Sequence, residues 1–240
     1  MPKKVLKTDL YILWGIIACL LVSSLLSYFL NIAFSNEIGY TVYEYQDGEY
    51  KKIETVYYED GKEGSEKTTQ NNRKIEPIRE DMPHSKKVGC NVFLFFLNML
   101  ILYFCIYLEV NGFGRKARFK KMTENVSPPR SEPFKIGFWA NTPFVLLYIL
   151  LVVFKLSGGK AADGFYTVFE LINTPAHPLI DIFTDFKYSP AAISWGAVAL
   201  IALTLLIVPI LTVTAYIFGY SNGEIVNSWI YKTDKKGKSE

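Results

Sequence analysis

Four long apolar runs decide what this 240-residue chain can fold into. They cover residues 10–34, 88–110, 136–156 and 193–219, and a helix needs roughly 20 apolar residues to cross the hydrocarbon core of a bilayer. Backbone polar groups in hydrocarbon must be satisfied within their own segment, so each run is predicted to be helical. The predicted fold class is an all-α integral membrane protein with four transmembrane helices, an extracytoplasmic β-hairpin loop and short interfacial helices.

The first run also has the basic residues of a signal peptide before it, at Lys3, Lys4 and Lys7. Its apolar stretch is too long for a signal core and no small-residue cleavage site follows, so we predict a retained span. The predicted segments are an N-tail with the first span (1–34), an extracytoplasmic loop (35–87), the second span (88–110), a basic cytoplasmic loop (111–135), the third span (136–156), an extracytoplasmic interfacial segment (157–192), the fourth span (193–219) and a cytoplasmic tail (220–240).

The distribution of charge predicts the orientation. Residues 1–9, 111–136 and 220–240 together hold 14 Lys or Arg against six acids. Residues 35–87 and 155–193, which are assigned to the extracytoplasmic side, together hold 12 Lys or Arg against 16 acids. Basic residues in short loops favour the cytoplasm, so both termini are predicted to be cytoplasmic in a multi-pass protein of a bacterial cell membrane. Lys86 and Lys87, just outside the second span, favour the inverted alternative.

The extracytoplasmic loop alternates aromatic or β-branched residues with polar ones. An Asp-Gly pair at 47–48 between two such runs predicts a hairpin with strands near 40–46 and 50–58. A second turn is predicted at 60–64 and a third strand near 73–79. Four tyrosines of this loop form a predicted partner surface, with ordinary strand formation as the alternative: Tyr43, Tyr45, Tyr50 and Tyr57.

Helix ends are predicted at three further places. Residues 164–173 and 179–186 are predicted to be short interfacial helices, separated by a break at Thr174–Pro178. Ser189-Pro190 is predicted to start the fourth spanning helix. Residues 111–114, Asn-Gly-Phe-Gly, are predicted to stop the second.

Two prolines interrupt the predicted spans. Pro143 cannot donate a hydrogen bond to the carbonyl of Trp139, and Pro209 cannot donate one to Leu205. Interrupted spans are typical of transporter substrate sites, so a cytoplasmic-side polar pocket is one interpretation, and plain helix kinks are the other. The candidate pocket residues are Asn141, Thr142 as a helix cap, Pro143, Thr212, Thr214 and Glu109.

Other polar groups carry weaker predictions. Asn98, at the middle of the second span, is interpreted as an inter-helix hydrogen-bonding residue or as a ligand contact. His177, Asp181 and Asp185 are spaced by four, so on one continuous helix they would share a face that could bind a divalent cation at the outer surface. Pro178 interrupts the series, and capping or solvation at the interface is the alternative interpretation. No catalytic, cofactor or metal site is predicted.

These patterns favour a non-enzymatic accessory or assembly subunit whose outer face docks a partner or ligand. The alternatives are a small-solute carrier or channel using the polar pocket, and a membrane enzyme acting at the outer surface. Predicted partners are the lipid bilayer and another membrane or extracytoplasmic protein, or a second copy of the chain. Nucleic acid is not predicted, because the basic residues at 115–121 are explained by topology and lipid contact.

Overall fold

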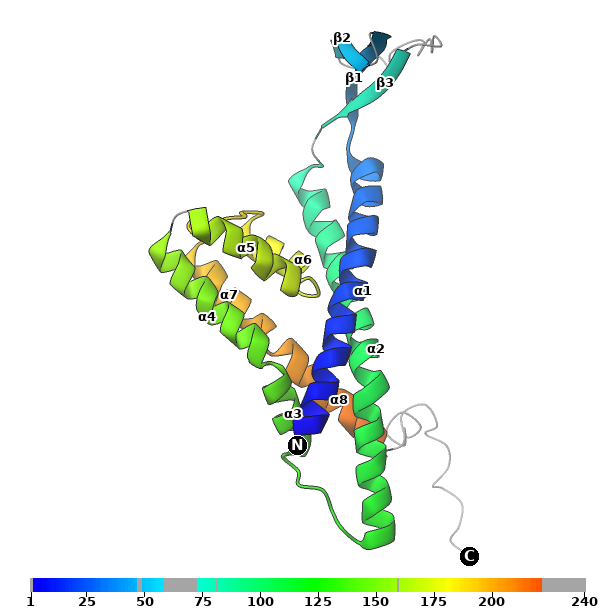
Figure 1. The fold of residues 1–240 in the computed structure, drawn as a ribbon, viewed down its shortest axis with the longest axis vertical. Helices are drawn as coiled ribbons and strands as arrows, with labels where there is room; N and C mark the ends of the chain where they lie inside the picture. Colours follow the sequence, from blue (N-terminus) through cyan, green and yellow to red (C-terminus); the bar gives the residue numbers. More distant parts are fainter. Residues whose placement is uncertain (1, 47–48, 58–72, 81, 159, 222–240) are drawn as a thin grey trace, which may run out of the picture. The chain divides into compact units, whose positions relative to one another are not determined.

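The computed structural model describes the chain except for residues 1, 47–48, 58–72, 81, 159 and 222–240. Most of the described residues are helical, and one small three-stranded sheet accompanies them (Figure 1). The predicted turns at 47–48 and 60–64, and the tail from residue 222, lie outside the described residues. The chain divides into two compact units, one of residues 1–23 and 91–240 and the other of residues 24–90.

Three helical segments are long and apolar enough to cross a membrane. They are α1 (Pro2–Phe34), α2 (His84–Glu124), and α7 (Trp195–Thr204) together with α8 (Ile207–Ser221). The number of such segments rises to four if two further helices count as one broken span. These helices are α3 (Glu132–Ala140) and α4 (Thr142–Ser157), which are bent by 45° at their junction. The predicted membrane-length helices are therefore confirmed in length and composition, and the third and fourth predicted spans each consist of two helices.

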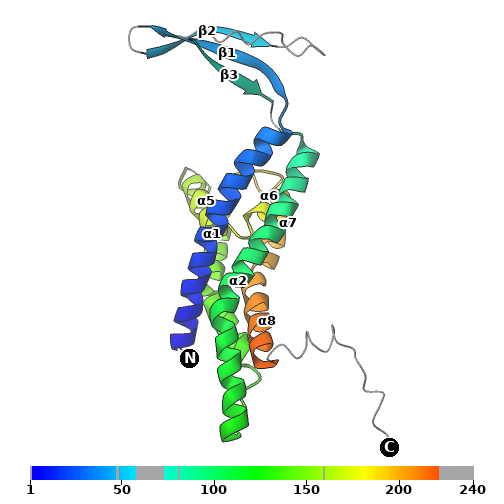
Figure 2. The same ribbon diagram turned by 90° about the vertical axis from the view of Figure 1, so that its right-hand side faces the viewer.

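The sheet lies in the residue 24–90 unit and has the strand order β2–β1–β3 (Figure 2). The central strand β1 (Glu37–Gln46) pairs antiparallel with β2 (Glu49–Tyr57) and with β3 (Arg73–Arg79). The predicted hairpin strands and the predicted third strand are thus confirmed. Three strands are also the smallest sheet expected to be stable without further support.

The second predicted helix does not stop at residues 111–114, because α2 continues through them to Glu124. A Cβ atom on Gly114 would overlap the backbone carbonyl of Tyr216, and one on Gly219 would overlap the backbone carbonyl of Asn111. These glycines allow the backbones of α2 and α8 to approach closely, which is their usual use in helix crossings. The glycine at 114 was therefore wrongly interpreted as a helix stop.

The predicted start of the fourth spanning helix at Ser189-Pro190 is also wrong. Helix α7 begins at Trp195, where the N-cap Ser194 Oγ accepts a hydrogen bond of 3.1 Å from the backbone N–H of Ala197. The Lys155 ammonium group donates to the carbonyls of Pro190 and Ile193, and these contacts hold the preceding residues in a turn.

Two apolar clusters form the core of the residue 1–23 and 91–240 unit. The first joins α1, α2, α3, α4 and α8 and includes Ile12, Leu102, Ile136, Phe144 and Val208. The second joins α4 and α7 to the helix–turn–helix of α5 (Lys160–Ile172) and α6 (His177–Thr184), and it includes Leu151, Tyr166, Phe169, Ala176, Ile180 and Ile201. Helix α5 packs on α4 and helix α6 packs on α7 (Figure 1).

Candidate functional site

Three interruptions of the helical chain meet between the two apolar clusters. Asn141 separates α3 from α4, residues 173–176 separate α5 from α6, and residues 205–206 separate α7 from α8. All three border one small, partly open pocket of about 20 Å³. Its lining residues are Leu102, Asn141, Phe144, Asn173, Pro175, Ala176, Thr204, Leu205, Ile207 and Val208.

The α3–α4 break supports the α7–α8 break directly. Pro209 has no N–H to donate to the carbonyl of Leu205, four residues earlier. The Asn141 Nδ2 group donates to that carbonyl instead, over 2.7 Å. Asn141 also occupies the N-cap position of α4, and its side chain makes no capping hydrogen bond there. The predicted cap at Thr142 is therefore wrong, because Asn141 holds the cap position and Thr142 begins the helix.

The space between the three breaks has the size of one water molecule. A cavity needs about 10–15 Å³ to hold a water, and this water needs polar partners. The Asn141 Oδ1 atom is buried and has no hydrogen-bond partner among the described residues. Asn141 Oδ1 is thus an unused acceptor beside a water-sized pocket whose other lining side chains are mostly apolar.

Asn98 attaches the α5–α6 turn to α2. Its Nδ2 donates to the carbonyl of Thr174 over 3.2 Å, and its Oδ1 accepts from the Ser23 hydroxyl over 2.8 Å. The side chain is fully buried. Asn98 therefore acts as the inter-helix hydrogen-bonding residue that one of its two interpretations predicted, and it does so at the turn that borders the cavity.

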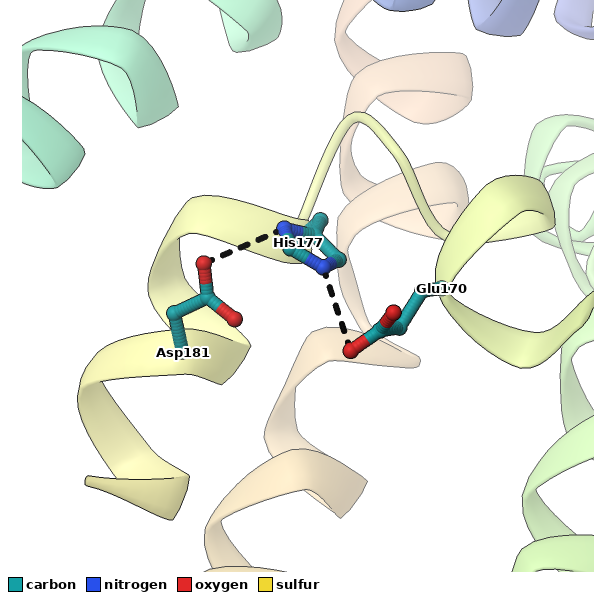
Figure 3. A group of neighbouring side chains, drawn as sticks. All are labelled: Glu170, His177 and Asp181. Atoms are coloured by element: carbon teal, nitrogen blue, oxygen red, sulfur yellow. Dashed lines mark ion pairs between the residues drawn. The ribbon is translucent and has the colours of Figure 1, made fainter. Parts of the chain in front are cut away.

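A charged cluster adjoins this turn. His177, the first residue of α6, lies between Glu170 of α5 and Asp181 of α6 (Figure 3). His177 Nε2 is 3.4 Å from Glu170 Oε1, and His177 Nδ1 is 3.3 Å from Asp181 Oδ2. From α2, the Asn91 Nδ2 group donates to the same Asp181 Oδ2 over 3.2 Å. We call Glu170, His177 and Asp181 the α5–α6 triad.

The two carboxyl groups of the triad favour the protonated form of His177. Burial by itself lowers the pKa of His177, but Asp181 and Glu170 outweigh that effect and raise it to about 9. His177 is therefore protonated at neutral pH and bridges Glu170 and Asp181. Tyr166 lies close enough for both carboxylates to raise its pKa further, beyond the larger effect of its burial.

The structure does not bring the six predicted pocket residues together. Asn141 lines the cavity, while Thr212 is buried against Gly137 of α3. Pro143 borders a separate apolar crevice, and Thr142 does not line the cavity.

The remaining two pocket candidates are engaged elsewhere. The Thr214 hydroxyl donates to the carbonyl of Ile210 in its own helix. Glu109 forms an ion pair of 3.3 Å with Lys7 of α1.

The predicted outer cluster is brought together in part. His177 and Asp181 form an ion pair, whereas Asp185 is the exposed, left-handed C-cap residue of α6 and takes no part in it. Glu170 takes the third place, and the sequence analysis missed it. Glu170 precedes His177 by seven residues across a break, so no helical spacing connects them. The available signal was that Glu170 is the one charged residue in the aromatic and aliphatic second half of α5.

The four predicted surface tyrosines share one face of the sheet. Side chains alternate along a strand and directly opposed residues share a face, and Tyr45 faces Tyr50. The register shifts between Val42 and Tyr43, so that β2 contributes one extra residue. Without this bulge Tyr50 and Tyr57, seven residues apart, would lie on opposite faces.

Comparison with protein-family models, with curated proteins and with solved structures finds no match to this chain.

Proposed function

We propose that this protein is a multi-pass protein of the cell membrane that binds a small polar solute within the membrane, as a carrier or channel. Both termini are placed in the cytoplasm in this proposal. The observation that carries it is the meeting of three helix breaks around one small pocket, next to the turn that Asn98 holds through the carbonyl of Thr174. It favours the carrier alternative of the sequence analysis over the accessory-subunit interpretation.

The depth of this space supports the proposal. Asn98 lies ten residues beyond Val88, the predicted outer end of the second span, and at 1.5 Å per residue this is about 15 Å. The hydrocarbon core is roughly 30 Å thick, so the α5–α6 turn would lie near its middle. In that arrangement α5 and α6 form a re-entrant hairpin that dips into the membrane, in place of the predicted interfacial helices.

Irregular backbone at such a depth leaves N–H and C=O groups without helical hydrogen bonds, which costs free energy in hydrocarbon. In hydrocarbon it is tolerated only where protein buries it or where it lines a water-filled cavity. Interrupted helices near the midplane form the substrate and ion sites of many transporters. The α5–α6 triad lies nearer the outer boundary, because Asn91, which contacts Asp181, is three residues beyond Val88, or about 5 Å at 1.5 Å per residue. Ionisable side chains within membrane segments are typical of substrate or ion pathways.

The proposal predicts that the α5–α6 turn becomes accessible to water. In a chain whose three cysteines, Cys19, Cys90 and Cys105, are replaced by alanine, a single cysteine is placed at Ala176. A membrane-impermeant methanethiosulfonate reagent should label Ala176→Cys in sealed or inverted vesicles, because a solute path must admit water. Labelling is measured by mass shift on a gel.

Ala215→Cys is the matched control. Ala215 is fully buried in the first apolar cluster and does not line the cavity, so its cysteine should stay unlabelled. If neither cysteine is labelled from either side of the membrane, water does not reach the α5–α6 turn. That result would contradict the solute path and the proposed function.

A second candidate function rests on the tyrosine face. Tyr45 and Tyr50 are 51% and 55% exposed, and their rings contact edge to face at 5.2 Å. Exposed tyrosines on a rigid surface are typical of protein–protein interfaces. This face supports docking of an extracytoplasmic partner, which is compatible with a carrier.

Replacing both Tyr45 and Tyr50 by alanine should then remove a partner that copurifies in mild detergent. Each buried interface tyrosine is worth about 2 kcal/mol, so the double substitution should abolish stoichiometric copurification. Tyr40→Ala is the control, because the register places Tyr40 on the opposite face. Retention of the partner by the double variant would contradict docking through this face.

A further inference from the structure

We propose that the α5–α6 triad is a binding site for a divalent transition-metal cation, with Glu170, His177 and Asp181 as ligands. The proposal rests on the proposed function and names the class of solute that the membrane site takes. The sequence analysis considered a divalent cation at His177, Asp181 and Asp185, and in the structure Glu170, from a different helix, stands in place of Asp185.

The ligand atoms are close to the positions that an ion requires. Each of the three residues offers one nitrogen or oxygen atom, and these atoms lie within 4.8 Å of one another. Two ligands at about 2.1 Å from a tetrahedral ion are about 3.4 Å apart, so side-chain movements of roughly 1 Å would close the site. The triad links the end of α5 to the start of α6, so only their side chains have to move.

A buried oxygen atom without a partner points to a missing cation. Asp181 is 7% exposed, and its Oδ1 has no hydrogen-bond partner among the described residues. Glu170 Oε1 lies 3.4 Å from His177 Nε2, so its present partner is the imidazole that would share the metal ion with it. Buried polar atoms are normally satisfied, so Asp181 Oδ1 indicates a ligand.

The second ligand sphere is already in place. Asn91 donates to Asp181 Oδ2, which fixes the carboxylate and leaves Oδ1 as the atom without a partner. Hydrogen bonds of this kind orient ligating carboxylates in known metal sites. The side chains of His177 and Glu170 are 27% and 21% exposed, so an ion has access to the site.

The donor set selects the class of metal. One imidazole nitrogen with two carboxylates suits zinc and other first-row transition metals, whereas Mg²⁺ and Ca²⁺ prefer oxygen ligands alone. His177 must give up a ring proton when it ligates a metal ion, so Zn²⁺ competes with that proton and should bind more tightly as the pH rises.

Titration calorimetry of the purified full chain in detergent tests the site, with Zn²⁺ as the probe and Mg²⁺ for comparison. Zn²⁺ should bind with one-to-one stoichiometry and Mg²⁺ should not compete at equal concentration. Asp181→Asn and Glu170→Gln should each weaken Zn²⁺ binding by about 100-fold or more, because each removes a charged ligand and second-sphere losses alone reach 10–100-fold. Asp185→Asn is the matched control and should change the affinity little, since Asp185 is exposed and asparagine is accepted at its left-handed conformation.

The outcomes separate the site from the proposed function. No Zn²⁺ binding, or equal loss in Asp185→Asn and Asp181→Asn, would overturn the metal site. Thermal unfolding of each variant shows whether it folds. If Asp181→Asn does not fold, Glu170→Gln tests the metal site instead, because the Glu170 side chain is more exposed than that of Asp181. Zn²⁺ entry into proteoliposomes that contain a zinc-sensitive dye tests transport separately. If Zn²⁺ binds to the protein but does not enter the proteoliposomes, the metal site stands and transport of zinc by this protein is contradicted.

Discussion

Gly114→Ala should destabilise the protein by about 3 kcal/mol, as expected for strong overpacking of a close-packed helix crossing. The added Cβ would overlap the backbone carbonyl of Tyr216, and its other near neighbours are the backbone atoms of Tyr220 and Gly219. Backbone atoms cannot move aside as a flexible side chain can, so α2 and α8 must separate. For a chain of this length the midpoint of thermal unfolding in mild detergent should fall by roughly 10 °C.

Gly112→Ala provides the control for this measurement. Gly112 belongs to the same helix and has no atom within 4 Å of its added Cβ. Alanine is favoured over glycine in a helix by about 0.5–1 kcal/mol, so Gly112→Ala should leave the protein unchanged or slightly more stable. Equal loss of stability in the two variants would mean that general helix propensity decides the effect and that the close crossing does not.

These two glycines illustrate what the sequence can predict. The apolar runs require helices, and alternation with a central Asp-Gly requires a hairpin, so the spans and the three strands were predictable. The crossing was not, because Asn-Gly-Phe-Gly is a typical helix stop when read locally. Only the position of α8 against α2 shows that Gly114 serves a contact more than 100 residues away in the chain.

The candidate site shows the same limit. The breaks at Pro143 and Pro209 follow from proline chemistry, and the sequence analysis located both. What lies between them depends on packing: Asn141 meets Leu205, while Thr214 bonds its own helix and Glu109 pairs with Lys7. The third break, at residues 173–176, was predicted as a break between two short helices, but its contact with Asn98 of α2 was not, because local sequence does not state what a turn packs against.

Asn141→Ala should cost about 2 kcal/mol, the cost of leaving a buried carbonyl without a hydrogen bond. The carbonyl concerned is that of Leu205, which Pro209 cannot satisfy and which accepts from Asn141 Nδ2 over 2.7 Å. Thermal unfolding of the purified chain in detergent measures the loss. Thr142→Ala is a control from the adjacent position, because Thr142 is the first residue of α4 and does not occupy its N-cap.

A double-mutant cycle with Pro209→Ala tests the cause of this loss. Alanine at 209 restores an N–H that can reach the carbonyl of Leu205, so the cost of Asn141→Ala should fall to below about 1 kcal/mol in that background. The same substitution would let α7 continue into α8 and close the break that borders the cavity, so labelling of Ala176→Cys should fall as well. An undiminished cost in the Pro209→Ala background would show that Asn141 does not compensate for the proline. Reduced cost with unchanged labelling would instead show that the broken fourth helix is stabilised by Asn141 but is not required for access to the α5–α6 turn.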